Sequence, residues 1–172
     1  IQANLGADII MAFDECPPHP STKEYFAASM HRTHRWLKRC LVRKKQLEKS
    51  GASKDQLLFG IVQGGSVKHL REESAQVVSC QNLPGIAIGG VAVGESKGAQ
   101  IEQVEWVVPN LSKDKPRYLM GIGTPLDLIN FVARGIDMFD CVLPTRLARH
   151  GSFWTCEGGV FKRVAITLTD FK

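Results

Sequence analysis

The sequence predicts an α/β fold and, within that class, a (β/α)₈ (TIM) barrel of which about five β/α units are present. Near-continuous apolar strands alternate with amphipathic helices, which is typical of a parallel sheet buried on both faces. Polar residues and glycines follow each strand at its carboxyl end, where such barrels build their sites. A doubly wound open sheet satisfies the alternation equally well, and the placement of the polar residues favours the barrel. Because five units fall short of eight, we expect the chain to be an internal fragment of a longer protein.

Short apolar runs, each closed by a turn signal, predict the strands. They cover residues 8–13, 57–62, 85–90, 117–121 and 138–140. The first run ends at Asp14 and the prolines after Cys16, the second at Gln63, and the third at Gly89 and Gly90.

The segments between these runs predict helices at 21–48, 66–80, 98–108 and 125–134. Ser21 is a candidate N-cap of the first helix, and Glu24 would complete a capping box. Gly135 predicts a C-terminal cap for the fourth helix.

The pattern changes after Arg146, where closely spaced glycines and aromatic residues predict a small antiparallel hairpin. We therefore expect a partial barrel that forms the catalytic domain at 1–150. Residues 151–172 would begin an appended C-terminal β-rich subdomain.

Composition narrows the class of protein. With 172 residues, the chain can form one domain with a sizeable core. Five cysteines without a CxxC pair or a secretory leader predict a reducing, cytoplasmic location. No apolar run approaches the roughly 20 residues that cross a bilayer, so we expect no membrane association. We interpret His31 and His34 as surface or packing residues, because no other potential metal ligand is near them in the sequence.

The net charge of +5 is unevenly distributed. Positive residues gather in 32–45 and again at Arg146, Arg149, Lys162 and Arg163, and such clusters favour a polyanion such as RNA. For the first cluster, we favour the simpler interpretation of a solvated helix face.

Asp140 is the residue that most needs an explanation. It stands in MFDCVLPTR, 138–146, where apolar neighbours predict burial, and an unpaired carboxylate would then cost several kcal/mol. Asp140 is therefore a candidate catalytic residue. The alternative is an aspartate at a strand end that caps the next turn.

Residues at the strand ends also form a candidate site for a purine. A carboxylate such as Asp14 can accept from the N–H groups of guanine, and the amide of Gln63 can donate to its carbonyl. Gly89 and Gly90 would let the backbone come close and add an N–H.

Five segments in order closely resemble the bacterial-type tRNA-guanine transglycosylases, also called queuine tRNA-ribosyltransferases: DIIMAFDECPP, LFGIVQGG, AIGGVAVGE, RYLMGIGTP and GIDMFDCVLPTR. The resemblance runs from Gln2 to about Gly159. It implies a transferase that exchanges guanine at the wobble position of tRNA anticodons for a 7-deazaguanine precursor of queuosine. It also implies double displacement through a covalent ribosyl-aspartate, with Asp140 as the nucleophile.

The resemblance assigns further residues by position. Val91 and Ala92 would present a peptide unit to the substituent of the base, and Glu95 would hold that peptide in orientation. Tyr118 and Met120 would lie against the faces of the base. Bulk at Cys16 and Val93 matches enzymes that use the small aminomethyl-deazaguanine. The implied base-binding residues are Asp14, Cys16, Gln63, Gly90, Val91, Ala92, Glu95, Tyr118 and Met120, and the implied anticodon-loop contacts are Arg146 and Arg149.

Other parts of the resembled family have no counterpart here. Its general acid/base aspartate would lie upstream of Ile1. Its zinc site, three cysteines and a histidine, would lie downstream of Lys172, so we expect zinc in the full-length protein and no zinc ligand within this chain. We also expect a homodimer at full length, and no turnover by the fragment alone.

Three other interpretations stay open. The chain could belong to a non-catalytic tRNA-binding accessory subunit, although such a subunit has no use for Asp140. It could be a metabolic barrel enzyme acting on a phosphorylated substrate, for which Gly121 and Gly123 are the candidate turn. It could be an archaeal-type transglycosylase, against which the runs AVGES and MFDCVLPTR argue.

Overall fold

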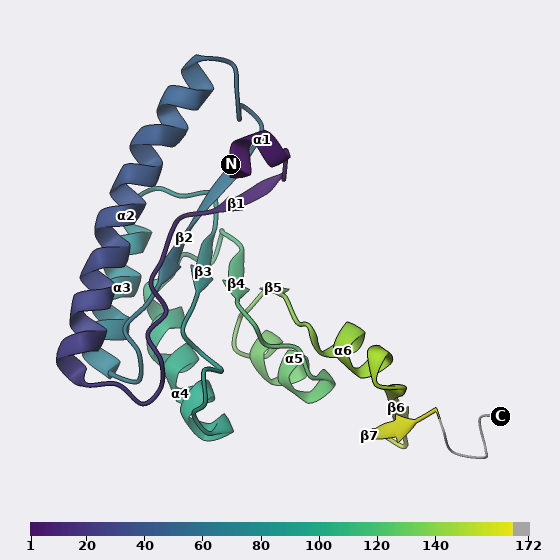
Figure 1. Cartoon of the computed structure of the whole chain (residues 1–172). Helices are drawn as coiled ribbons and strands as arrows, with labels where there is room; N and C mark the ends of the chain where they lie inside the picture. The colour runs from purple at the N-terminus through teal and green to yellow at the C-terminus, as the bar shows by residue number, and fades with distance from the viewer. Residues whose placement is uncertain (167–172) are drawn as a thin grey trace.

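The computed structural model describes residues 1–166, and the end of the predicted appended segment, 167–172, lies outside the described residues. Its main part is a sheet of five parallel strands that lie in sequence order, β1 to β5 (Figure 1). The strands are β1 (Ile9–Met11), β2 (Leu57–Val62), β3 (Ile86–Ile88), β4 (Arg117–Leu119) and β5 (Met138–Phe139).

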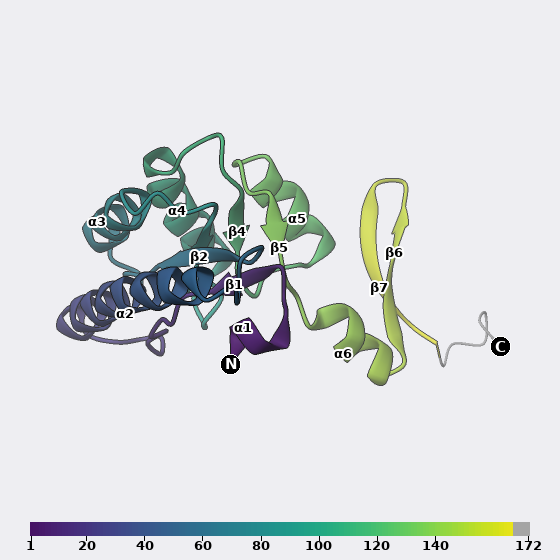
Figure 2. The same ribbon diagram turned by 90° about the horizontal axis from the view of Figure 1, so that it is seen from above.

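Four helices connect successive strands and cover one face of the sheet (Figure 2). They are α2 (Lys23–Lys49), α3 (Lys68–Ser79), α4 (Lys97–Val107) and α5 (Pro125–Val132). A doubly wound sheet reverses its strand order and carries helices on both faces, so this arrangement is instead half of a barrel. The predicted α/β class and the partial barrel are confirmed to that extent.

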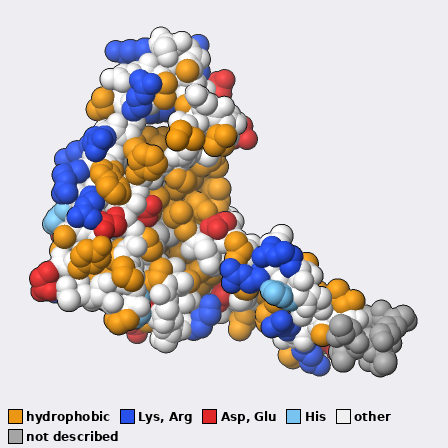
Figure 3. Space-filling view, viewed as in Figure 1, with side chains coloured by type: hydrophobic (Ala, Val, Ile, Leu, Met, Phe, Trp, Pro, Cys, Tyr) orange, Lys and Arg blue, Asp and Glu red, His pale blue; other side chains and the backbone are white. Residues whose placement is uncertain are grey.

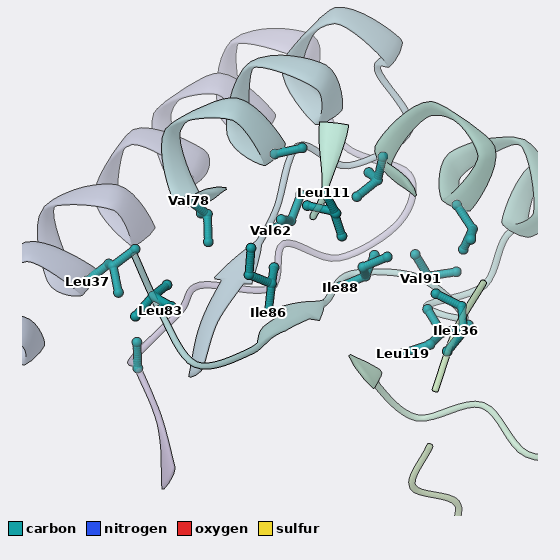
Figure 4. Packing of buried hydrophobic residues seen from close by; sticks show 14 of the residues in the cluster. Leu37, Val62, Val78, Leu83, Ile86, Ile88, Val91, Leu111, Leu119 and Ile136 are labelled. Carbon is teal, nitrogen blue, oxygen red and sulfur yellow. The ribbon is translucent and has the colours of Figure 1, made fainter. Parts of the chain in front are cut away.

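The main hydrophobic core lies between these helices and the sheet (Figure 4). Strand residues such as Val62, Ile86 and Ile88 meet Leu37 of α2 and Val78 of α3, all buried. The side chains that alternate with them along the strands point to the opposite, concave face. On that face apolar side chains gather over the strands in the centre of Figure 3.

The predicted hairpin is present. β6 (Ser152–Glu157) and β7 (Val160–Ala165) pair antiparallel across Gly158 and Gly159, which have φ of +56° and +80°. Two consecutive left-handed residues suit a two-residue hairpin turn. The hairpin extends away from the sheet (Figure 1), and a domain division at residue 150 stays a prediction.

Several predicted boundaries were wrong. The N-cap of α2 is Thr22, whose hydroxyl accepts from Tyr25 N at 3.2 Å, because Ser21 instead donates to Pro18 O. α5 ends at Val132, two residues before the predicted end. The cap predicted at Gly135 is confirmed, because this left-handed residue closes a Schellman motif in which Gly135 N donates to Val132 O at 2.9 Å and Ile136 N donates to Phe131 O at 3.1 Å.

Three short helices lacked a periodic apolar stripe long enough to predict. They are α1 (Gln2–Leu5), the 3₁₀ helix η1 (Val108–Asn110) and α6 (Leu143–Arg149). α1 contacts the sheet through Gln2, whose side-chain amide donates to Met11 O at 2.8 Å and accepts from Met11 N at 2.9 Å. Gln2 thereby covers part of the free edge of β1.

The histidine prediction is confirmed for His34, which is buried with Nε2 3.0 Å from Ser74 Oγ. No helix within residues 1–166 combines the length and the apolar character needed to cross a membrane.

Candidate active site at the strand ends

Asp14 and Gln63 lie side by side at the carboxyl ends of β1 and β2. Gln63 Nε2 donates to Asp14 Oδ2 at 2.7 Å, and Gln63 is fully buried with its backbone N–H donating to Ser74 Oγ. Burial raises the pKa of Asp14, and the hydrogen bond from Gln63 partly offsets the rise. Gln63 Oε1 is buried and has no hydrogen-bond partner among the described residues. The pair therefore retains unused hydrogen-bonding capacity, as a ligand site requires.

The loop after β3 brings backbone against this pair. Gly90 has φ of +65°, a conformation that favours glycine. A Cβ at Gly90 would collide with Gln63 Oε1, and one at Gly89 would lie 2.7 Å from Gln63 Nε2. Only glycines therefore allow this close approach.

Arg71 of α3 fixes the loops and was missed in the sequence analysis. Its side chain is fully buried and donates to Gly65 O at 2.7 Å, Gly89 O at 2.5 Å and Gly90 O at 2.7 Å. It also donates to Gln103 Oε1 of α4 at 2.8 Å. Burial lowers its pKa to about 10, opposed by Glu95, so the guanidinium stays charged at neutral pH.

A sequence signal for Arg71 was available. The buried residues of α3 are Leu70, Arg71, Ser74, Ala75 and Val78, which share one helical face. An arginine on the core stripe of a helix must satisfy its donors internally, and backbone carbonyls of nearby loops are the available acceptors.

The next stretch of the β3 loop is held by Glu95. Its Oε1 accepts from Ala92 N at 2.6 Å and its Oε2 from Val93 N at 2.9 Å. Glu95 thus holds the N–H of the Val91–Ala92 peptide. The roles of Glu95 and of this peptide in base binding stay predictions. Cys16 as a residue is exposed, but surrounding atoms partly shield its sulfur from water, and this desolvation and the charge of Asp14 raise the pKa of its thiol.

Asp140 is placed differently from the expectation. It is the first residue after β5 and is exposed, so the predicted cost of burial does not arise. Its Oδ1 accepts from the Tyr118 hydroxyl at 2.7 Å and from Gly121 N at 2.8 Å. Its Oδ2 accepts no hydrogen bond from residues 1–166.

Tyr118 therefore contacts the carboxylate through its hydroxyl. Burial, followed by the hydrogen bond to Asp140, raises the pKa of Tyr118, so the phenol remains a donor at neutral pH. Met120 directly follows the last residue of β4 and is partly buried.

The basic residues near the site lie on α6. Arg146 and Arg149 are exposed in its last turn, and neither forms an ion pair within the described part of the chain. No group of three or more His, Cys, Asp or Glu side chains that could hold a metal ion occurs among residues 1–166, and the zinc expected for the full-length protein stays a prediction.

The fold and site together define a (β/α)-barrel protein with carboxylates, an amide and a glycine-lined loop at its strand ends. Comparison with known proteins makes this class specific. The family model described as Queuine tRNA-ribosyltransferase matches residues 1–172. The chain belongs to the queuine tRNA-ribosyltransferase family, which confirms the resemblance.

Individual relatives support the same assignment. The queuine tRNA-ribosyltransferase of Halothermothrix orenii is 51% identical over 171 residues, which cover 99% of this chain and 44% of that protein. That of Herpetosiphon aurantiacus is 56% identical over 158 residues, covering 92% and 38%. That of Halalkalibacterium halodurans is 51% identical over 172 residues, covering 100% and 44%. The chain therefore spans less than half the length of these relatives.

Proposed function

We propose that this chain is the central part of a transferase that exchanges guanine at the wobble position of tRNA anticodons for a 7-deazaguanine precursor of queuosine. The observation that carries the proposal is the pairing of two arrangements on one edge of the half barrel. Asp14 and Gln63 lie against a glycine loop, and Asp140 is held by Tyr118 and Gly121.

Asp140 is the nucleophile. Its Oδ1 is occupied by two donors, which orient the carboxylate and leave Oδ2 to attack C1′ of the ribose. The new C1′–O bond forms as the bond from C1′ to the guanine nitrogen breaks, and the base departs with that electron pair and takes up a proton. The product is a ribosyl-aspartate ester, with the RNA backbone uncut.

The incoming base then reverses the substitution. Its ring nitrogen attacks C1′, the ester bond to Asp140 breaks, and the carboxylate is regenerated. Two inversions give net retention at C1′. The base loses a proton in this step, so the exchange is balanced in atoms and charge.

Asp14 and Gln63 recognise the base in both steps. Ionised Asp14 accepts from the N–H groups of the guanine edge, and the second N–H of Gln63 Nε2 donates to the guanine carbonyl together with Gly90 N–H. Cys16 and the peptide between Val91 and Ala92, oriented by Glu95, line the part of the pocket that meets the substituent. Met120 covers the base, and Arg146 and Arg149 bind the unstacked nucleotides around it.

The test uses the chain extended to the full length of its relatives. Native enzyme and Asp140→Asn are incubated with radiolabelled guanine and unmodified tRNA that carries a wobble guanosine. We expect label in the tRNA with the native enzyme and none with the variant, and a denaturation-resistant enzyme–RNA adduct with the native enzyme alone.

Label with both proteins would remove Asp140 from the nucleophile's role. Binding of tRNA without label in either would favour the alternative of a non-catalytic accessory subunit. The geometry argues against that alternative, because an accessory subunit gains nothing from a carboxylate oriented by two donors.

A further inference from the structure

Positive charge is concentrated on one helix. α2 contains nine Lys and Arg residues against two Glu, a net charge of +7. The whole chain carries +5, from 22 basic and 17 acidic residues, so the residues outside α2 number 13 basic and 15 acidic and sum to −2. The basic character of the chain therefore resides in α2.

Within α2 the cations form a stripe opposite the buried face. The stripe consists of Arg35, Lys38, Arg39, Arg43, Lys45 and Lys49, all of them exposed. At 100° per residue they fall on the side away from the buried Phe26, Met30, Thr33 and Leu37. Figure 3 shows Lys and Arg side chains gathered along α2.

The stripe lacks compensating carboxylates. Within residues 1–166 none of its six cations forms an ion pair, whereas Arg32 pairs with Glu15 and Lys44 with Glu48. Solvated outer faces of helices usually alternate the two signs at i and i+4, which stabilises the helix. Six uncompensated cations repel one another, and a polyanionic partner that neutralises them would explain why they are clustered.

The distance of the stripe from the strand ends determines which part of an RNA it can contact. α2 begins just after the loop that carries Asp14, at the strand-end side, and runs back along the sheet (Figure 1). Arg35 is twelve residues beyond Lys23, so the stripe starts about 18 Å from that end and continues for about 21 Å. At that distance from the strand ends, the stripe is better placed to meet a part of the RNA other than the nucleotides in the site.

We infer that the outer face of α2 binds the phosphate backbone of the tRNA substrate outside its anticodon arm. This inference rests on the proposed function for the identity of the RNA. It also replaces the solvated-face interpretation that the sequence alone favoured.

The test uses a variant of the full-length enzyme that lacks three positive charges of the stripe, Arg35→Gln with Lys38→Gln and Lys45→Gln. Arg39 and Arg43 are kept because they also line an apolar groove beside β1. The matched control is Lys54→Gln with Lys113→Gln and Lys115→Gln, which removes the same charge from loops that precede β2 and β4. Binding of whole tRNA and of an isolated anticodon stem-loop is measured as a function of salt.

We expect the stripe variant to bind whole tRNA about tenfold or more weakly near 0.1 M salt, with a slope of log K against log salt that is smaller by roughly 2 to 3. Its affinity for the stem-loop and its guanine incorporation into the stem-loop should match the native enzyme. The control variant should retain the native affinity and slope for both RNAs.

Equal loss by the stripe and control variants, or equal loss on whole tRNA and stem-loop, would overturn the inference while leaving the proposed function intact. Failure of the native enzyme to bind either RNA would overturn both.

Discussion

At the scale of single residues, the two oxygens of Asp140 have unequal surroundings. Oδ1 accepts from Tyr118 and Gly121, whereas Oδ2 accepts nothing from residues 1–166. The two donors also differ, because one is a backbone N–H, which only a proline would remove, and the other is a side-chain hydroxyl. Mutation can therefore test the orientation of the carboxylate separately from its presence.

Tyr118→Phe should slow the chemistry more than it weakens base binding. A hydrogen bond to a charged group contributes about 1.5–3 kcal/mol, so we expect kcat for guanine exchange to fall roughly 10- to 100-fold with KM for guanine little changed. Tyr25→Phe, which removes a hydroxyl that donates to Glu15 at 2.8 Å, is the control and should keep the native kcat. A higher KM at unchanged kcat would instead assign Tyr118 to the floor of the base pocket.

Ionised Asp14 should lower the stability of the fold at neutral pH, although the proposed function needs it for base binding. Burial raises its pKa in the folded state, so its stabilising contribution is present below the unfolded-state pKa and is lost as pH rises through the folded-state pKa. Asp14→Asn should therefore raise Tm at neutral pH relative to native protein, and the difference should shrink at acid pH. Thermal unfolding at several pH values measures this.

The same substitution should weaken guanine binding. In the proposed function ionised Asp14 accepts from the base. KM for guanine should then rise for the native enzyme as pH falls toward the raised pKa of Asp14, while Asp14→Asn should show a high, pH-independent KM over that range. An Asp14→Asn enzyme with native KM would exclude Asp14 from base recognition.

At the scale of elements, α3 shows what periodicity can and cannot predict. Its apolar residues Leu70, Ala75 and Val78 lie on one face at helical spacing and are buried. Arg71 lies on the same face, but hydrophobic patterning counts it as polar and places it in solvent. The acceptors that keep it inside, Gly65 and Gly89 among them, belong to loops that only the fold brings together.

Arg71→Met should be strongly destabilising. The side chains are similar in length, but the substitution leaves several buried carbonyls and Gln103 Oε1 without a donor, each costing about 1–3 kcal/mol. We expect a loss of more than about 3 kcal/mol in the free energy of unfolding by urea denaturation. Arg134→Met, which breaks an ion pair with the exposed Glu105, is the control and should cost about 1 kcal/mol or less.

At the scale of the whole molecule, the strand order explains both the success and the limits of sequence analysis. Parallel β/α units were predicted from alternating apolar runs, and the strand ends from their polar residues. The contact between Tyr118 and Asp140 was not, because it depends on the register of β4 and β5, which pair Tyr118 with Met138. Local patterns carry no information on that register.

The half barrel leaves apolar surface on its concave face. Phe13, which follows the edge strand β1, is 66% exposed and lines an apolar groove with Trp36 of α2. We expect the isolated 172-residue chain to bind a dye such as ANS and to self-associate with rising concentration, because uncovered sheet edges and apolar patches both promote association. Dye fluorescence and sedimentation measure this. The full-length enzyme should do neither at the same concentration, and a monomeric, dye-silent fragment would contradict the expectation.

Arg71 also has a consequence for how the site forms. Its one guanidinium joins the loop after β2, the loop after β3 and the flank of α4. Opening any one of the three leaves a donor of the buried guanidinium without a partner, which costs free energy and loosens the side chain that the other two contact, so we expect them to open as one cooperative unit. In native-state hydrogen exchange the amides of these loops should then share one opening free energy, and the pocket would be either fully assembled or absent.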